Sequence, residues 1–161
     1  MLTNSIGPPE LAVGIFSAGI STALDRPPEY DTHWDGFGER YGMRFTSIVP
    51  GNIMEAGLGA IWGEDPRYFR VPDEHFGARL KSIVKQTFVA RHSDGSFAPA
   101  YARFIAIPAS NFLSNTWRPD SEANTHDALI RTAEGFAGRM AANAFVEFWP
   151  DIRTHVFHRT E

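Results

Sequence analysis

The sequence predicts an all-α fold, a bundle of four to five helices that pack closely through faces of small side chains. The first observation is that small residues recur at every fourth position in two segments, which places them on one face of a helix. The second is the scarcity of strand signals, because hardly any stretch alternates apolar and polar residues with β-branched side chains. A face of small side chains allows a second helix to approach closely. The two rows are Gly14, Ala18 and Thr22, and Ala98, Ala102, Ala106, Ser110 and Ser114.

The composition is that of an ordinary globular protein. A chain of 161 residues is predicted to form a single domain, with residues 1–10 and 153–161 as loose tails. The net charge of −4 argues against a nucleic-acid partner, and the absence of cysteine excludes disulfides and thiolate metal sites. The chain has no phosphate-loop or dinucleotide-binding motif and its histidines are scattered. We therefore predict no cofactor and no metal.

The segment from Ser96 to Trp117 is the predicted central helix. Arg103 is the only charged residue in this segment. Its bulky side chains collect on a different side from the row of small residues. A helix so poor in charge is expected to be buried in a protein core or shielded by lipid. The bulky residues are Tyr101, Phe104, Ile105 and Phe112.

Further helices are predicted from apolar periodicity, with boundaries set by capping residues and prolines. A proline inside a helix removes a backbone hydrogen bond, so proline kinks are expected in two helices, one of them near Pro50. The Ser93-Asp94-Gly95 sequence predicts a tight turn into the central helix. The further helices are Leu11–Leu24, Glu39–Trp62, one that is capped by Asp73 and buries Phe76, Leu80, Ile83, Val84, Thr87 and Phe88, and one that is capped by Thr125 and stopped by Pro150.

Three predicted helices end alike, at Trp62, Trp117 and Trp149, each followed by proline and aspartate. A tryptophan at a helix end can bury its ring and still offer its N–H group to a polar partner. The pattern is consistent with a degenerate helical-hairpin repeat, although pairs of tryptophan and proline at helix ends also arise by chance.

Glu55 is the only charged residue between Arg44 and Glu64. A buried carboxylate must find a cation or its pKa rises, and such groups are candidates for acid–base chemistry. The structural alternative is that Glu55 faces water or pairs with an arginine such as Arg103. Ion pairs of this kind are more often structural than catalytic.

Polar residues at the predicted helix ends form a second set of candidates. Arg67 is expected to fork onto the carboxylate of Asp120 or Asp151, because a guanidinium can donate two parallel hydrogen bonds to a carboxylate. These corners either form one polar mouth for a ligand or lock the helix ends together. Together with Glu55, the candidate site residues are Asp65, Arg67, Tyr68, Asn111, Asn115, Trp117, Asp120, Trp149 and Asp151.

Four short motifs carry a resemblance to a known family. They are R-Y-G at 40–42, E-D-P-R-Y-F at 64–69, S-N-T-W-R-P-D at 114–120 and E-F-W-P-D-I at 147–152. In this order they resemble a family of bacterial helical proteins to which no activity is assigned. Many members look like exported or envelope-associated proteins. The resemblance therefore implies a place in the bacterial cell envelope and assigns no catalytic residue.

These observations lead to one preferred function and two alternatives. We expect a non-enzymatic helical packing or interaction module that associates with itself, with a protein partner or with a membrane complex of the bacterial envelope. The basic edge of Lys81, Lys85 and Arg91 beside an apolar stripe is consistent with membrane contact. One alternative is a small-ligand-binding protein or enzyme that uses Glu55 and the polar helix ends. The other is a cytoplasmic bundle with a purely structural role.

Overall fold

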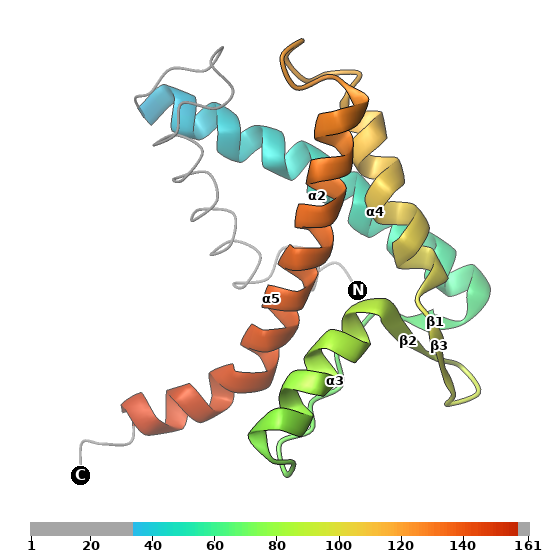
Figure 1. The fold of residues 1–161 in the computed structure, drawn as a ribbon, viewed down its shortest axis with the longest axis vertical. Helices are drawn as coiled ribbons and strands as arrows, with labels where there is room; N and C mark the ends of the chain where they lie inside the picture. Colours follow the sequence, from blue (N-terminus) through green and yellow to red (C-terminus); the bar gives the residue numbers. More distant parts are fainter. Residues whose placement is uncertain (1–33, 158–161) are drawn as a thin grey trace.

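The computed structural model describes residues 34–157, without the side chains of residues 40, 44, 45, 47 and 155–157. This part of the chain forms four helices and one three-stranded antiparallel sheet (Figure 1). The prediction of a largely helical protein is confirmed, and the prediction that it is purely all-α is wrong. The predicted helix Leu11–Leu24 and its row of small residues lie outside the described residues.

The helices alternate with short strands along the chain. The strands pair in the order β1-β2-β3, with Glu64 opposite His92 and Ala90 opposite Ala98. None of the described helices is long and apolar enough to cross a membrane. The elements are α2 (Trp34–Trp62), β1 (Glu64–Asp65), α3 (Phe76–Phe88), β2 (Val89–His92), β3 (Phe97–Pro99), α4 (Tyr101–Ser114) and α5 (Thr125–Phe157).

The sheet was missed because its strands are only two to four residues long, too short for an alternating pattern to be recognised. The turn at Ser93-Asp94-Gly95 does not enter a helix but connects β2 with β3. Gly95 has a φ of 84°, a conformation that glycine adopts without strain. Ala98 therefore belongs to a strand, and the helix predicted from Ser96 to Trp117 begins only at Tyr101 and ends at Ser114.

Helices α2 and α4 pack against each other closely. Ala102, Ala106, Ser110 and Ser114 of α4 are all buried. A Cβ atom at Gly51 of α2 would lie only 2.9 Å from the Ser110 hydroxyl oxygen, so no larger residue fits there without a shift. The remaining four small residues of the α4 row thus lie in the interior.

Helix α2 is longer than predicted and passes through Pro50 as one helix. It begins at Trp34, five residues before the predicted start at Glu39, within a stretch expected to be an exposed connection. Trp34 and Phe37 meet edge to face with ring centroids 6.0 Å apart, and Phe37 stacks on Tyr41 at 6.1 Å. Aromatic contacts along one helix face thus accompany the extra helical turn.

Helices α3 and α5 run antiparallel. Phe76 near the start of α3 meets Phe148 of α5, with ring centroids 5.6 Å apart, and Phe88 at its end meets Phe136 at 5.7 Å. Figure 1 shows α5 changing direction over its last turns, and Pro150 lies inside this helix. The helix nevertheless continues to Phe157, so the prediction that Pro150 stops it is wrong.

Two predicted caps are also wrong. The residue before α3 is His75, which makes no side-chain capping bond, and Asp73 lies in the preceding turn. At the start of α5 the cap is Asn124 rather than Thr125. The Asn124 side-chain oxygen accepts a hydrogen bond from the Asp127 backbone N–H at 2.9 Å. Both asparagine and threonine suit this position, so sequence alone does not choose between neighbours.

Candidate functional site

Arg103 of α4 is the centre of a buried polar cluster that joins three elements. Only 2% of the residue is exposed. Its Nε donates to the Glu55 carboxylate of α2 at 2.8 Å, and its Nη1 donates to the backbone carbonyls of Gln86 and Thr87, both at 2.8 Å. Burial, followed by repulsion from Arg139, lowers the pKa of the guanidinium. Glu55 thus pairs with Arg103, as the structural interpretation of its isolated charge expected.

Arg139 and Glu64 complete this cluster from two further elements. Arg139 of α5 lies 3.5 Å from the Glu55 carboxylate and also donates to the Pro66 carbonyl. Glu64 of β1 accepts the backbone N–H of Ala102 at 3.1 Å, in the first turn of α4. A carboxylate is favoured there because a helix start carries partial positive charge. The cluster therefore holds the helices and the sheet together.

A second buried carboxylate, Glu147, fixes α5 to α3 and to the loop before it. Glu147 has no exposed surface. It accepts from Arg79 Nε at 2.7 Å and from the Val71 backbone N–H at 3.2 Å. Arg79 also donates to Asp151 and lies 4.5 Å above the centre of the Phe148 ring. One arginine thus engages three residues of α5.

Tyr68 lies beside this second cluster and has an unusual hydroxyl. The oxygen is buried without a well-formed hydrogen bond, near the side chains of Ser82 and Glu147. Burial raises the pKa of Tyr68 to about 12, because it disfavours the phenolate. The network around Glu147 therefore keeps a neutral phenol at its edge.

We expect Tyr68 to ionise only at a pH well above the ordinary pKa of tyrosine. Because its pKa is raised in the folded protein, its contribution to stability is complete below the pKa of an unfolded tyrosine, near 10, and is lost as the pH rises towards 12. A spectrophotometric titration of tyrosinate absorbance measures this step. Tyr68→Phe should remove a tyrosinate step near pH 12, and an unaltered titration of the variant would contradict this assignment.

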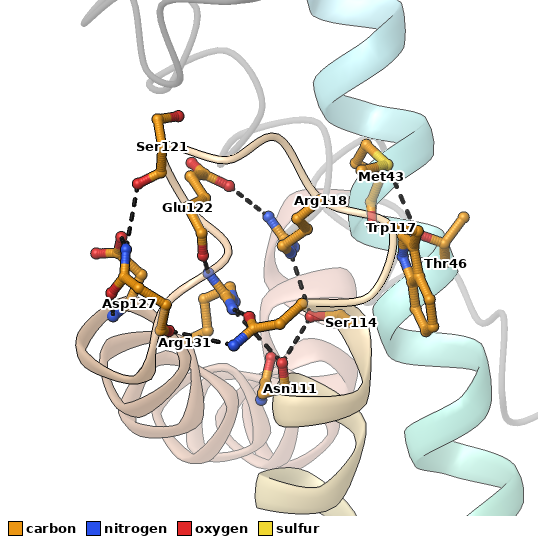
Figure 2. A network of polar contacts seen from close by, with 12 residues as sticks. Met43, Thr46, Asn111, Ser114, Trp117, Arg118, Ser121, Glu122, Asp127 and Arg131 are labelled. Carbon is orange, nitrogen blue, oxygen red and sulfur yellow. Dashed lines mark hydrogen bonds and ion pairs between the residues drawn. The ribbon is translucent and has the colours of Figure 1, made fainter.

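A third polar network joins the end of α4 to the start of α5 (Figure 2). Arg131 of α5 donates to the Asn115 side-chain oxygen and to the Glu122 carbonyl at 3.0 Å. Arg118 donates to the Glu122 carboxylate at 2.6 Å. Trp117 donates its indole N–H to the Thr46 hydroxyl of α2 at 3.1 Å. The loop between α4 and α5 is thereby tied to both helices and to α2.

The predicted fork of Arg67 onto Asp120 or Asp151 is wrong. Arg67 donates instead to both carboxylate oxygens of Asp65, at 2.6 to 3.1 Å, and the Arg67 guanidinium lowers the pKa of Asp65. A partner two residues away in the same turn is reached with little loss of side-chain freedom, so it prevails over distant carboxylates. Asp151 is bound by Arg79 and Arg70, and Asp120 is exposed.

The structure does not bring the candidate residues together in one cleft. Glu55 and the Asp65–Tyr68 turn lie towards the start of α4, where Arg103 is. Asn111 lies in the second half of α4, about 12 Å from Arg103 at about 1.5 Å per residue, and Asn115 and Trp117 lie beyond its end, at least about 18 Å away. Trp149 is inside α5 and stacks on Phe145 with ring centroids 5.0 Å apart. Within residues 34–157 no group of three or more histidines and carboxylates could hold a metal ion.

The largest feature that sequence reasoning missed is an apolar groove between α3 and α5. Its volume is about 660 Å³, and all ten residues that line it are apolar. Its lining runs from residue 80 to 88 on α3 and from 133 to 144 on α5. These stretches correspond to about 12 Å and about 16 Å of helix. The lining residues are Leu80, Ile83, Val84, Phe88, Ala133, Phe136, Ala137, Met140, Ala141 and Ala144.

The groove exposes side chains that the sequence predicts to be buried. Ile83 and Thr87 of the predicted stripe are buried, but Leu80 is 42% exposed and Val84 46%. Phe76, in the first turn of α3, is 66% exposed. The prediction that this stripe is buried is therefore wrong for Phe76, Leu80, Val84 and Phe88, because periodicity reports only which residues share a face. It does not report whether the described chain supplies enough neighbours to cover that face.

No protein-family model matches this chain, and neither does any curated protein or solved structure.

Proposed function

We propose that the protein is a non-enzymatic helical interaction module whose α3–α5 groove binds an apolar helix. The observation that carries the proposal is a long, open groove without a polar side chain in its lining. Exposed apolar surfaces that are continuous over several residues usually mark interaction sites, because solvation of such a surface is unfavourable. A groove between two helices is the usual receptor for the apolar face of a third.

The dimensions of the groove support a helix as the occupant. The lining covers about 12 Å of α3 and about 16 Å of α5, which corresponds to about two to three helical turns. Ala133, Ala137 and Ala141 of α5 are exposed and small, so a third backbone can approach that helix closely. Leu80 and Val84 form the opposite wall. Helices pack with axes about 8 to 10 Å apart, which a row of alanines permits.

The charges beside the groove restrict the occupant. Lys81 and Lys85 are exposed and follow the outer edge of the apolar stripe on α3, and Glu134 is exposed on α5. The groove itself carries no charge, and a charged group placed in it would be desolvated without a partner. The inserted face is therefore apolar over its whole length. The proposal also includes a place in the bacterial envelope, which the sequence resemblance implies. Flotation of the full chain with lipid vesicles tests this part of the proposal.

The alternative of an enzyme or small-ligand binder receives less support. Glu55, Asp65 and Asp151 are each engaged by arginine. Asn115 and Trp117 are engaged in the network at the end of α4. These contacts join elements of the fold, which is the role that buried polar pairs most often have.

The absence of cysteine permits a direct test by thiol labelling of the full chain. Ala137→Cys places one thiol in the groove, and Ile53→Cys places a matched thiol on α2, where the residue is 64% exposed. A water-soluble maleimide is allowed to react before and after addition of a lysine-flanked peptide with leucine and alanine at i, i+3, i+4 and i+7. We expect the Ala137→Cys thiol to react at least about tenfold more slowly than the control thiol, either from the start or once the peptide is added. Equal rates that the peptide does not change would overturn the proposal.

A further inference from the structure

We propose that the chain's own segment Leu11–Leu24 occupies the α3–α5 groove. This inference rests on the proposed function of the groove. The segment reads L-A-V-G-I-F-S-A-G-I-S-T-A-L and contains no charged residue. Fourteen residues in a helix extend about 21 Å, which is enough to cover the whole lining of about 12 to 16 Å.

The side chains of the segment fit an apolar groove in pattern as well as in length. Val13, Phe16, Ile20 and Leu24 follow the i, i+3, i+7, i+11 spacing that places them on one face of a helix. This is the spacing with which helices insert anchors into grooves. Four bulky apolar side chains at this spacing extend over about three turns, as the lining of the groove does on α5. The described helices α2 to α5 all contain charged residues and are already placed in the fold.

The connection to the described part of the chain also permits this contact. Nine residues, Asp25–His33, separate Leu24 from Trp34 at the start of α2. At up to about 3.3 Å per residue they reach as far as about 30 Å. A segment tethered in this way acts at a high effective concentration. This tethering favours Leu11–Leu24 as the occupant over a separate helix of equal intrinsic affinity.

The cysteine-free background permits a crosslinking test on the full chain. Ile20→Cys is combined with Ala137→Cys in the groove and, as the matched control, with Ile53→Cys on α2. Each pair is treated with a short bismaleimide and analysed by gel mobility and mass spectrometry, and circular dichroism checks that both variants are folded. We expect a crosslinked monomer for the groove pair, at least about tenfold more abundant than for the control pair.

The other outcomes distinguish this inference from the function on which it rests. A crosslinked dimer with the groove pair would show that a second copy fills the groove, and equal crosslinking in both pairs would show random contact. Each result overturns the inference. Absence of a crosslink, together with a protected Ala137→Cys thiol or one that the added peptide protects, would leave the groove as a helix-binding site and overturn only the role of Leu11–Leu24. If no crosslink forms and the Ala137→Cys thiol is protected neither in the free chain nor by the added peptide, the proposed function is overturned as well.

Discussion

Arg103→Met is expected to lower the free energy of unfolding by about 3 to 5 kcal/mol, the usual effect of breaking a buried ion pair. The methionine fills much of the same space but leaves the Glu55 carboxylate with Arg139 alone, 3.5 Å away. It also leaves the buried carbonyls of Gln86 and Thr87 without their donor. Urea unfolding of the variant and the natural chain, followed by circular dichroism, measures the difference.

The matched variants separate the charge of Arg103 from its hydrogen bonds. Arg103→Lys keeps the positive charge but cannot donate to Glu55 and to two carbonyls in the same geometry, so its effect should be intermediate. Glu55→Gln combined with Arg103→Met should cost less than the sum of the single changes, because each single change leaves the other charge unpaired. If Arg103→Met lowered the free energy of unfolding by less than about 1 kcal/mol, water or Arg139 would have to replace the lost hydrogen bonds of Arg103, contrary to this account.

Glu147→Ala is expected to destabilise the protein by about 3 kcal/mol, because it leaves buried groups without their acceptor. The Val71 backbone N–H loses its partner, and Arg79 loses one of two carboxylates. Arg79 keeps Asp151, so the expected loss is smaller than for Arg103. Thermal unfolding at neutral pH measures it.

Glu134→Ala is the matched control for this second prediction. Glu134 lies on the same helix but is exposed, and surface changes of this kind alter stability by no more than about 0.5 kcal/mol. Equal effects of the two changes would mean that Glu147 acts through helix propensity alone. A smaller effect of Glu147→Ala than of the control would contradict the role given to the buried carboxylate.

The sequence predicts the helices better than their ends. Apolar periodicity repeats over many residues, so it identifies α3, α4 and α5 despite local exceptions. A boundary depends on one or two residues, and several of them can serve. Pro150 shows this, because α5 continues to Phe157 although the missing N–H would be expected to stop it. The small strands were not predicted because β1 is only two residues long.

The polar clusters were only partly predictable. Glu55 is conspicuous because no other charge occurs near it in the sequence. Glu147 has a similar signal, because it is the only charged residue between Arg139 and Asp151, but nothing in the sequence identifies its partner Arg79, which is 68 positions away on another charged helix. The groove was missed for a related reason. Leu80 and Val84 have the spacing of core residues, and only the arrangement of α3 against α5 leaves them exposed.

The long separation between the buried charges and their partners has a consequence for synthesis on the ribosome. Glu55 meets Arg103 48 positions later, and Arg79 meets Glu147 68 positions later. A nascent chain therefore carries each early charge in contact with water until the later partner has emerged. Because contacts this distant in sequence form slowly, we expect the final collapse to wait until residues near 147 have left the exit tunnel.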